Sequence, residues 1–363
     1  MKIAIYYNLE KGGALNSIIE SIKFLRKYNK IDVYCFQKNI SKKLVNNFFI
    51  YNFKKTNNIF QDLFQIIFEL KKINKNIAQD IDKNNYDLVL IHPCLLTQSP
   101  YILRFLKNEK NIYFFQEPKR EFYEQTSFDY WSIKKIITRL IRLPIKYIDK
   151  KNCKSAKNII SNSIFTANNL LKNYKKSSTI IYPGLKPITP KKITIKNNKK
   201  ILSVGLFSKL KGHDFSIEQL NNIVNKITIL GRETNESQKI FNLAKQNNIS
   251  LNIAKTENNK EKDNYYKNYS IYLANNQSEP FGITTLESTS NNCLVLGKNE
   301  GGTPEIIKNG INGYLYSDVY EAKKILKQIL SQKELTFYQI NTIDWKYTTN
   351  KILEYYNRHI NHD

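Results

Sequence analysis

Two glutamates and a glycine turn in the second half of the chain have the residue types and the spacing of a site for phosphate and a diol. The segment Glu279-Pro280-Phe281-Gly282 follows an apolar run over 270–274 and forms a turn before a predicted helix that begins at Gly282–Ile283. The first amides of a helix have no partner within it and favour negative charge, so this helix start predicts a phosphate site. Glu287 lies about one turn into the helix, where its carboxylate can accept two hydrogen bonds from a vicinal diol such as a ribose.

A second glycine turn follows the next apolar run. Glu300-Gly301-Gly302-Thr303-Pro304-Glu305 comes directly after the run over 293–296. Glycines let backbone approach a ligand closely. Because Glu279 also stands at a predicted strand end, we expect both turns to face one ligand.

Alternating strand and helix patterns must position these residues. Near-continuous apolar runs predict strands over 3–7, 31–36, 87–91, 111–115 and 158–161, then over 200–206, 227–230, 249–254, 270–274 and 293–296. Helical spacing is expected over 15–28, 59–73, 320–330 and 348–356, and after each of the first four strands of the second set. A polar, proline-containing linker is expected at 186–198. The pattern predicts an α/β fold with two Rossmann-like, doubly wound domains, whose ligands bind at the carboxyl ends of the strands.

Composition and charge narrow the function classes. The 363 residues include 57 Lys and Arg against 31 Asp and Glu, a net charge of +26. Residues 1–190 carry 33 of these basic residues and 14 of the acidic ones, so an anionic partner is expected on that side. The four cysteines form no CxxC pair, which argues against a zinc site or a disulfide framework. Neither a membrane-spanning run nor a signal peptide is expected, and a cytoplasmic protein is predicted.

Several motifs resemble those of the retaining glycosyltransferases of family 4, which have the GT-B fold. EPFGITTLE (279–287) resembles the family's E-x7-E motif, and EGGTPEIIKNGINGYL (300–315) resembles its next conserved stretch. KGGA (11–14), DLVLIHP (87–93), NIYFFQEP (111–118), SNSIF (161–165), IIYPGL (180–185) and ILSVGLFSKLKG (201–212) resemble further segments in the family's order, and 344–345 begin one that crosses back to the first domain.

The resemblance implies two domains facing a central cleft. We expect an acceptor-binding domain over 1–188, a donor domain over 189–344, and a helix over 345–363 that returns to the first domain. The implied donor is a UDP- or GDP-linked sugar, and the acceptor is a glycan or a lipid-linked molecule. Surface polysaccharide, lipopolysaccharide or glycolipid synthesis is the implied setting.

The resemblance also assigns roles. The implied catalytic residues are His92, Glu279, which contacts the transferred sugar, and Lys211, which neutralises the diphosphate. Donor-binding residues on the same basis are Gly12, Gly13, Lys209, Phe281, Gly282, Ile283, Thr284 and Glu287. Transfer with retention needs neither a cofactor nor a metal in this family, and Asp80-Ile81-Asp82 is interpreted as solvated carboxylates rather than a metal site.

Departures from the family pattern keep alternatives open. Leu206 stands where the family has an arginine, and Lys209 or a residue of the first domain is the expected substitute; Gln116 stands where many members have histidine. A GT-B protein that binds donor or glycan without catalysis is therefore an alternative. A nucleic-acid-binding protein is a weaker one, since no RNP, helix-turn-helix or zinc pattern accompanies the charge.

One basic segment points toward a membrane. Residues 131–157 hold nine basic residues and one acidic residue among regularly spaced isoleucines and leucines, with Pro144 interrupting any single helix. A basic amphipathic segment of this kind predicts peripheral contact with an anionic membrane, on its inner face for a cytoplasmic protein. The alternative is a helix packed on the sheet with a solvated basic face.

Overall fold

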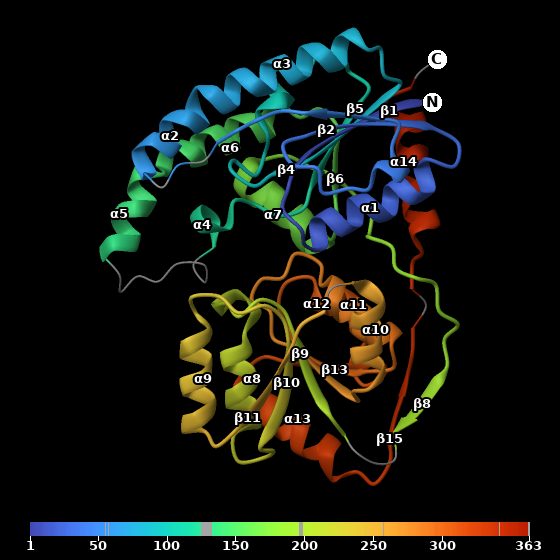
Figure 1. Ribbon diagram of the computed structural model, residues 1–363. Coiled ribbons are helices and arrows are strands. Elements are labelled where there is room, and N and C mark those ends of the chain that lie inside the picture. The colour runs from blue at the N-terminus through green and yellow to red at the C-terminus, as the bar shows by residue number, and fades with distance from the viewer. Residues whose placement is uncertain are drawn as a thin grey trace. The chain divides into compact units, whose positions relative to one another are not determined.

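The chain folds into two compact units, each built on its own parallel sheet (Figure 1). The computed structural model describes residues 1–54, 56, 58–124, 133–195, 199–256, 258–340 and 342–361. Unit 1 comprises Met1–Gly184 together with Ile343–Asp363, and unit 2 comprises Leu185–Thr342.

Unit 1 contains a seven-stranded sheet of order β3-β2-β1-β4-β5-β6-β7 in which all neighbouring strands are parallel. Its strands are β1 (Lys2–Asn8), β2 (Lys30–Cys35), β3 (Asn47–Ile50), β4 (Leu88–Cys94), β5 (Asn111–Phe115), β6 (Ile159–Ser161) and β7 (Thr179–Ile180). Its helices are α1 (Gly13–Leu25), α2 (Ile59–Ile67), α3 (Glu69–Lys83), α4 (Arg120–Tyr123), α5 (Ile133–Ile141), α6 (Leu143–Ser155), α7 (Ile164–Tyr174) and α14 (Trp345–His359), with 3-10 turns η1 (Lys42–Leu44) and η2 (Tyr101–Arg104).

Two hydrophobic cores cover the faces of this sheet. One joins strand residues to α3, α6 and α7, and the other joins them to α1 and α14. Every residue of β4 is buried, which explains why the central strands are apolar along their whole length. The expected strands of this half are confirmed with small shifts at their ends, whereas β3 and β7 were not predicted. Both are edge strands with exposed residues, so they lack a continuous apolar run.

The last helix belongs to unit 1, although it follows unit 2 in the sequence. Asp344 caps α14 by accepting a hydrogen bond from the Tyr347 amide at 2.6 Å. Ile352 and Tyr356 are buried in the core that also contains α1 residues. The Thr348 hydroxyl donates to the Tyr182 carbonyl at 2.9 Å, which ties the helix to the chain before the junction.

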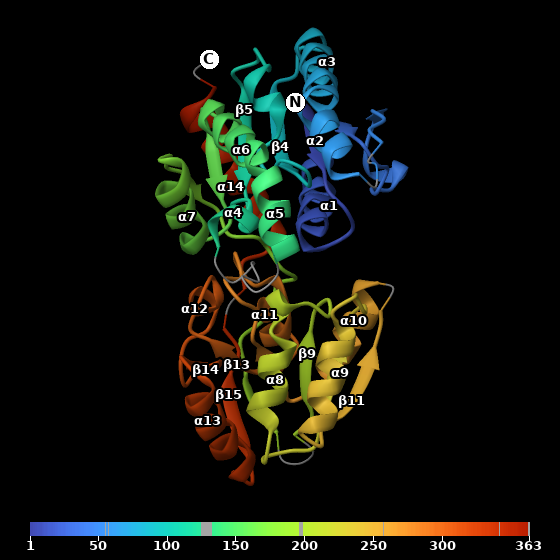
Figure 2. The same cartoon turned by 90° about the vertical axis from the view of Figure 1, so that its left-hand side faces the viewer.

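Unit 2 contains a six-stranded parallel sheet of order β11-β10-β9-β12-β13-β14 and a separate antiparallel pair, β15 with β8. Its strands are β8 (Lys192–Ile195), β9 (Ile201–Val204), β10 (Lys226–Leu230), β11 (Ser250–Ala254), β12 (Ile271–Ala274), β13 (Leu294–Lys298), β14 (Gly313–Tyr316) and β15 (Leu335–Tyr338). Its helices are α8 (His213–Leu220), α9 (Ser237–Gln246), α10 (Asn259–Lys267), α11 (Ile283–Ser290), α12 (Thr303–Ile306) and α13 (Val319–Ser331), with the 3-10 turn η3 (Lys209–Lys211). Figure 2 shows α8 and α9 in front of the sheet, and its core also includes residues of α13.

Two expectations need correction. The segment expected as a linker contains β8, whose residues Lys192 to Ile195 pair with β15, because Ile193 and Ile195 alternate with polar residues and pack on the core of unit 2. Residues 196–198 of that segment lie outside the described residues. The helix expected over 59–73 is divided at Phe68 into α2 and α3, although Phe68 still donates to Phe64 and accepts from Lys72.

Candidate functional site

Loops after three neighbouring strands of unit 2 bring most of the predicted donor-site residues together. β9, β12 and β13 are adjacent in the sheet, and the predicted site residues of unit 2 follow the ends of β9 and β12. The two glycine turns pack backbone against backbone, since the Gly302 amide donates to the Glu279 carbonyl at 2.7 Å. Gly301 has φ +69, and a Cβ there would lie 2.5 Å from the Glu279 carbonyl oxygen. Only glycine therefore allows this approach.

Glu279 is paired with the lysine that the motifs predicted. Lys211 Nζ lies 3.0 Å from Glu279 Oε2, and the Asn276 side-chain amide donates to the same oxygen at 2.9 Å. Both side chains of the ion pair remain partly accessible, at 29% for the lysine and 16% for the glutamate. The aliphatic stem of Lys211 lies over Gly205, where a Cβ would be 2.8 Å from the lysine Cγ. This geometry leaves a fixed cation at the end of the sheet.

Glu287 is held by two residues of α10 that no motif predicted. Lys262 Nζ lies 2.7 Å from Oε1, and the Tyr266 hydroxyl donates to Oε2 at 3.1 Å. Burial raises the pKa of the Glu287 carboxyl, and the charge of Lys262 opposes that rise. The two partners are four residues apart on one helix, so they reach the carboxylate from the same side. The four-residue spacing can be seen in the sequence, but the sequence does not show that both side chains contact Glu287.

Helix α11 begins where the glycine turn predicted the start of a helix. Gly282 precedes the helix with φ 99, and α11 begins at Ile283. The first-turn amides of an α-helix have no intrahelical acceptor, so those of Ile283 and Thr284 are available to an anion. The Tyr272 hydroxyl donates to Thr284 Oγ1 at 3.0 Å, and the Phe281 side chain is buried.

The position of the expected arginine is occupied by an exposed aliphatic side chain. Leu206 is 44% exposed in the loop after β9. Lys209, the predicted substitute, is exposed, and its amide donates to Glu236 at 2.7 Å. A further cation, Arg232, stands at the end of the neighbouring strand β10, and its carbonyl accepts from the Phe207 amide at 3.0 Å. Arg232 was not predicted, because no motif includes it.

The predicted residues of unit 1 lie at the ends of the neighbouring strands β1 and β4. His92, near the end of β4, is 5% exposed and stacks on Phe114 with ring centroids 4.5 Å apart. Burial lowers its pKa to about 3, so the imidazole is neutral near pH 7. Its Nδ1 is buried without a hydrogen-bond partner. Gly12 precedes α1, whose first residue is Gly13, and a Cβ on Gly12 would meet no atom within 4 Å.

Other polar residues have structural explanations. Asp80 accepts from the Tyr51 hydroxyl at 2.5 Å, and Asp82 accepts from the Lys107 and Asn108 amides, so the D-x-D segment is engaged within the fold. His213 is bonded to Ser203 at 3.0 Å and to the Gly205 carbonyl. Among the residues described, no cluster of His, Cys, Asp and Glu has the arrangement of a metal site, and no helix is long and apolar enough to cross a membrane. The four cysteines are buried and free.

Comparison of the whole fold with solved structures identifies its class. The chain superposes on a glycosyltransferase from Rickettsia africae with a TM-score of 0.69 at 18% identity, covering 100% of this chain and 99% of that one. HepE of Anabaena in complex with UDP and glucose gives 0.68 at 14% identity, covering 99% and 100%. WaaG, a glycosyltransferase involved in lipopolysaccharide biosynthesis, gives 0.63 at 14% identity, covering 99% and 96%. The expected GT-B fold is confirmed.

A sequence match lies within unit 2. The family model described as glycosyl transferases group 1 matches residues 186–341, nearly the whole of unit 2. Protein CapJ of Staphylococcus aureus is 24% identical over 223 residues, which are 57% of this chain and 55% of CapJ. Alpha-1,3/1,6-mannosyltransferase ALG2 of Homo sapiens is 24% identical over 211 residues, 49% of this chain and 51% of that protein. The matches thus span about half the length of these curated relatives.

Proposed function

We propose that the chain is a glycosyltransferase that moves a sugar from a UDP- or GDP-linked donor to a glycan or lipid-linked acceptor. The observation that carries this proposal is the arrangement of the two glutamates in unit 2. Glu279 is paired with Lys211 before the start of α11, and Glu287 is held by Lys262 and Tyr266 inside that helix. Cation, helix amides and a buried carboxylate together suit a diphosphate and a ribose. The structures of HepE with UDP and glucose support a nucleotide-sugar donor by fold likeness.

The proposed chemistry is transfer with retention and without a metal. The acceptor oxygen bonds to the anomeric carbon on the face from which the diphosphate departs. The acceptor proton passes to an oxygen of the departing diphosphate. Lys211 and the amides of Ile283 and Thr284 stabilise the charge that grows on that group, and Glu279 orients the sugar. The proposed part of His92, which is neutral because of its burial, is a hydrogen bond rather than a charge.

The proposed setting is the synthesis of surface polysaccharide, lipopolysaccharide or glycolipid in the cytoplasm, at the inner face of the membrane. The role of WaaG in lipopolysaccharide biosynthesis favours a glycan or lipid-linked acceptor, and the mannosyltransferase name of ALG2 fits the transfer of a sugar. The basic first half of the chain suits an anionic surface or a phosphorylated acceptor.

Thermal unfolding with a panel of nucleotides tests the donor site. UDP, GDP, ADP and their common sugar conjugates would be added to the wild type, to Glu287→Ala and to Glu233→Ala, a control in which an exposed glutamate of unit 2 is removed. Ligand at about 100 times Kd adds about 2.7 kcal/mol, which raises Tm by several degrees. We expect one nucleotide to stabilise the wild type and the control but not Glu287→Ala. A folded wild type that responds to no nucleotide would contradict the proposal.

One observation favours a second candidate, a GT-B protein that binds its ligand without catalysis. Leu206 presents an exposed aliphatic side chain where a cation is expected beside the diphosphate. Turnover separates the two functions, since a binding protein gains stability with a nucleotide sugar yet releases no nucleotide with any acceptor. Leu206→Arg would then be expected to restore or raise turnover.

A further inference from the structure

Helix α2 exposes aromatic side chains to solvent while its opposite side is packed in unit 1. Phe60 and Phe64 of α2, and Phe68 directly after its end, are 65%, 59% and 57% exposed. They are spaced four residues apart, so they form one stripe, and the rings of Phe64 and Phe68 lie 4.6 Å apart. Ile66 of the same helix is buried. A surface helix normally has one apolar face, and the second apolar stripe of α2 has no packing partner among the described residues that would account for it.

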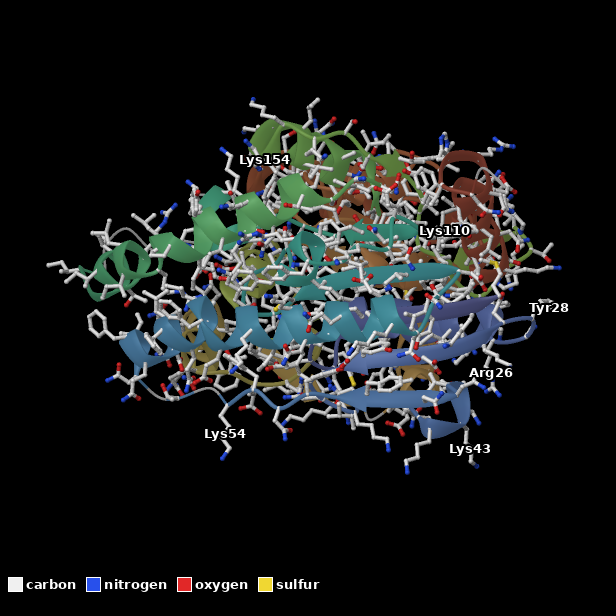
Figure 3. All side chains as sticks on the ribbon, turned by 90° about the horizontal axis from the view of Figure 1, so that it is seen from above. Arg26, Tyr28, Lys43, Lys54, Lys110 and Lys154 are labelled. Carbon is white, nitrogen blue, oxygen red and sulfur yellow. The ribbon has the colours of Figure 1, made fainter. Side chains whose placement is uncertain are left out.

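Helix α5 adds a second exposed apolar stripe. Ile133, Ile137 and Leu140 are 74%, 51% and 59% exposed. In all three views α5 and the start of α2 lie side by side at the same end of unit 1 (Figures 1, 2 and 3). We call this surface the apolar end of unit 1, and its members are Phe60, Phe64, Phe68, Ile133, Ile136, Ile137, Leu140 and Leu143. Scattered exposed apolar residues are normal, but a contiguous group of this kind marks an interaction site.

Exposed lysines lie on the two helices that come after α2 and α5 in the chain. On α3 they are Lys71, Lys72 and Lys75, and on α6 they are Lys150, Lys151 and Lys154. Asp149 is the one acidic residue in the sequence between positions 133 and 184, and it is fully buried. The α5–α6 side of this surface therefore presents positive charge to its partner. The partner must be apolar where it meets the phenylalanines and anionic where it meets the lysines.

We propose that the apolar end of unit 1 inserts into a lipid bilayer that contains anionic lipids. A bilayer supplies acyl chains to the aromatic and aliphatic side chains and phosphate headgroups to the lysines beside them. A second copy of the chain suits the surface less well, since a symmetric contact brings like charges together. The surface extends the membrane segment expected at 131–157 by a second helix, α2; residues 131 and 132 of that segment lie outside the described residues. The inference deepens the lipid-linked acceptor of the proposed function and depends on it for its biological meaning.

Vesicle binding by the full-length protein tests the surface without any sugar chemistry. Flotation would be measured with vesicles of phosphatidylcholine and with vesicles of phosphatidylcholine and phosphatidylglycerol in equal parts. The variant is Phe60→Ser with Phe64→Ser, and the matched control is Tyr28→Ser. Tyr28 is 88% exposed and is labelled in Figure 3 at the end of unit 1 away from α5. A second variant changes Lys150, Lys151 and Lys154 to glutamine. Thermal unfolding confirms that each variant is folded.

We expect binding to the anionic vesicles that weakens with added salt. The double phenylalanine variant should bind at least about tenfold more weakly, and loss of each lysine should cost about fivefold, with Tyr28→Ser unchanged. Wild type that floats with neither vesicle, or a phenylalanine variant that binds like wild type, overturns the inference. Dimers that the phenylalanine variant abolishes would assign the surface to self-association and also overturn it. Nucleotide stabilisation in the same samples reports separately on the proposed function.

Discussion

The Lys262 ammonium lies 2.7 Å from Glu287 Oε1, so the carboxylate proposed to hold the donor ribose is itself held by a cation from a different helix. The side chains are only 18% and 13% exposed. Burial raises the pKa of Glu287, and the lysine charge limits that rise. Lys262 is therefore a positioning residue: its charge opposes the rise in the pKa of Glu287, and its contact orients the carboxylate.

Replacing Lys262 with methionine should weaken nucleotide binding by about tenfold or more, because a buried carboxylate without its cation takes up a proton more readily. The pKa of Glu287 then rises further, so the loss of affinity should grow as the pH falls from about 8 to about 5. Calorimetric titration with the stabilising nucleotide at several pH values measures this loss of affinity. Lys267→Met, at an exposed site of the same helix, is the control. Equal affinity of Lys262→Met and wild type across this range would show that the pair is only structural.

Replacing Lys211 should reduce turnover more than replacing Lys209, although the two lysines are only two residues apart. Lys211 is fixed by Glu279 at 3.0 Å, whereas Lys209 is exposed. Loss of a preorganised charge at the departing group costs about 100- to 1,000-fold in kcat. We expect a loss in that range for Lys211→Met and a smaller one for Lys209→Met, measured as nucleotide release with saturating acceptor. The reverse order would move the diphosphate cation to Lys209, and equal small losses would direct attention to Arg232.

Gly301, in the second glycine turn, should tolerate replacement by alanine much less well than the exposed Gly310. Gly301→Ala combines φ +69 with a Cβ 2.5 Å from the Glu279 carbonyl oxygen, so the turn must move and carry Glu279 with it. Gly310 has φ +76, but a Cβ there meets nothing within 4 Å, which leaves only a backbone cost of about 1 kcal/mol. We expect Gly301→Ala to lose both stability and nucleotide binding, while Gly310→Ala keeps its binding. Thermal unfolding with and without nucleotide distinguishes the two; a Gly301→Ala protein that binds normally would contradict this account.

The sequence predicted the site best where one motif holds both the turn and its charged residues. EPFGITTLE places Glu279, Gly282 and Glu287 along one strand–turn–helix unit, and the structure has that unit at β12 and α11. Lys211 was predicted as a site residue, but its pairing with Glu279 was not, and Lys262 was not predicted at all. Both lysines are distant in sequence from their glutamates, and the fold brings them near.

The exposed stripe of α2 shows a different limit. Its phenylalanines have the spacing of a core face, and periodicity alone cannot tell an apolar face that meets the protein from one that meets solvent. Short edge strands such as β7 are not predicted for the opposite reason, because their exposed residues form no apolar run.

His92 should uncouple turnover from nucleotide binding. It lies in unit 1 with an unpaired, buried Nδ1, whereas the proposed nucleotide site is in unit 2. We therefore expect His92→Gln to lower kcat while the nucleotide raises Tm as in wild type. If the variant keeps wild-type turnover, the orphan nitrogen has no role in transfer.

His92 should also leave a signature in the pH dependence of stability. Because burial lowers its pKa from 6.5 to about 3, it contributes stability that is complete above pH 6.5 and is lost as the pH falls toward 3. Between about pH 6.5 and 5 that loss amounts to about 2 kcal/mol in unit 1. Asp149 acts in the opposite sense, since burial raises its pKa to about 6 and its contribution is lost as the pH rises. Denaturant unfolding of wild type, His92→Gln and Asp149→Asn separates the two contributions. His92→Gln should be less sensitive to acid than wild type, whereas Asp149→Asn should be more sensitive to acid than wild type.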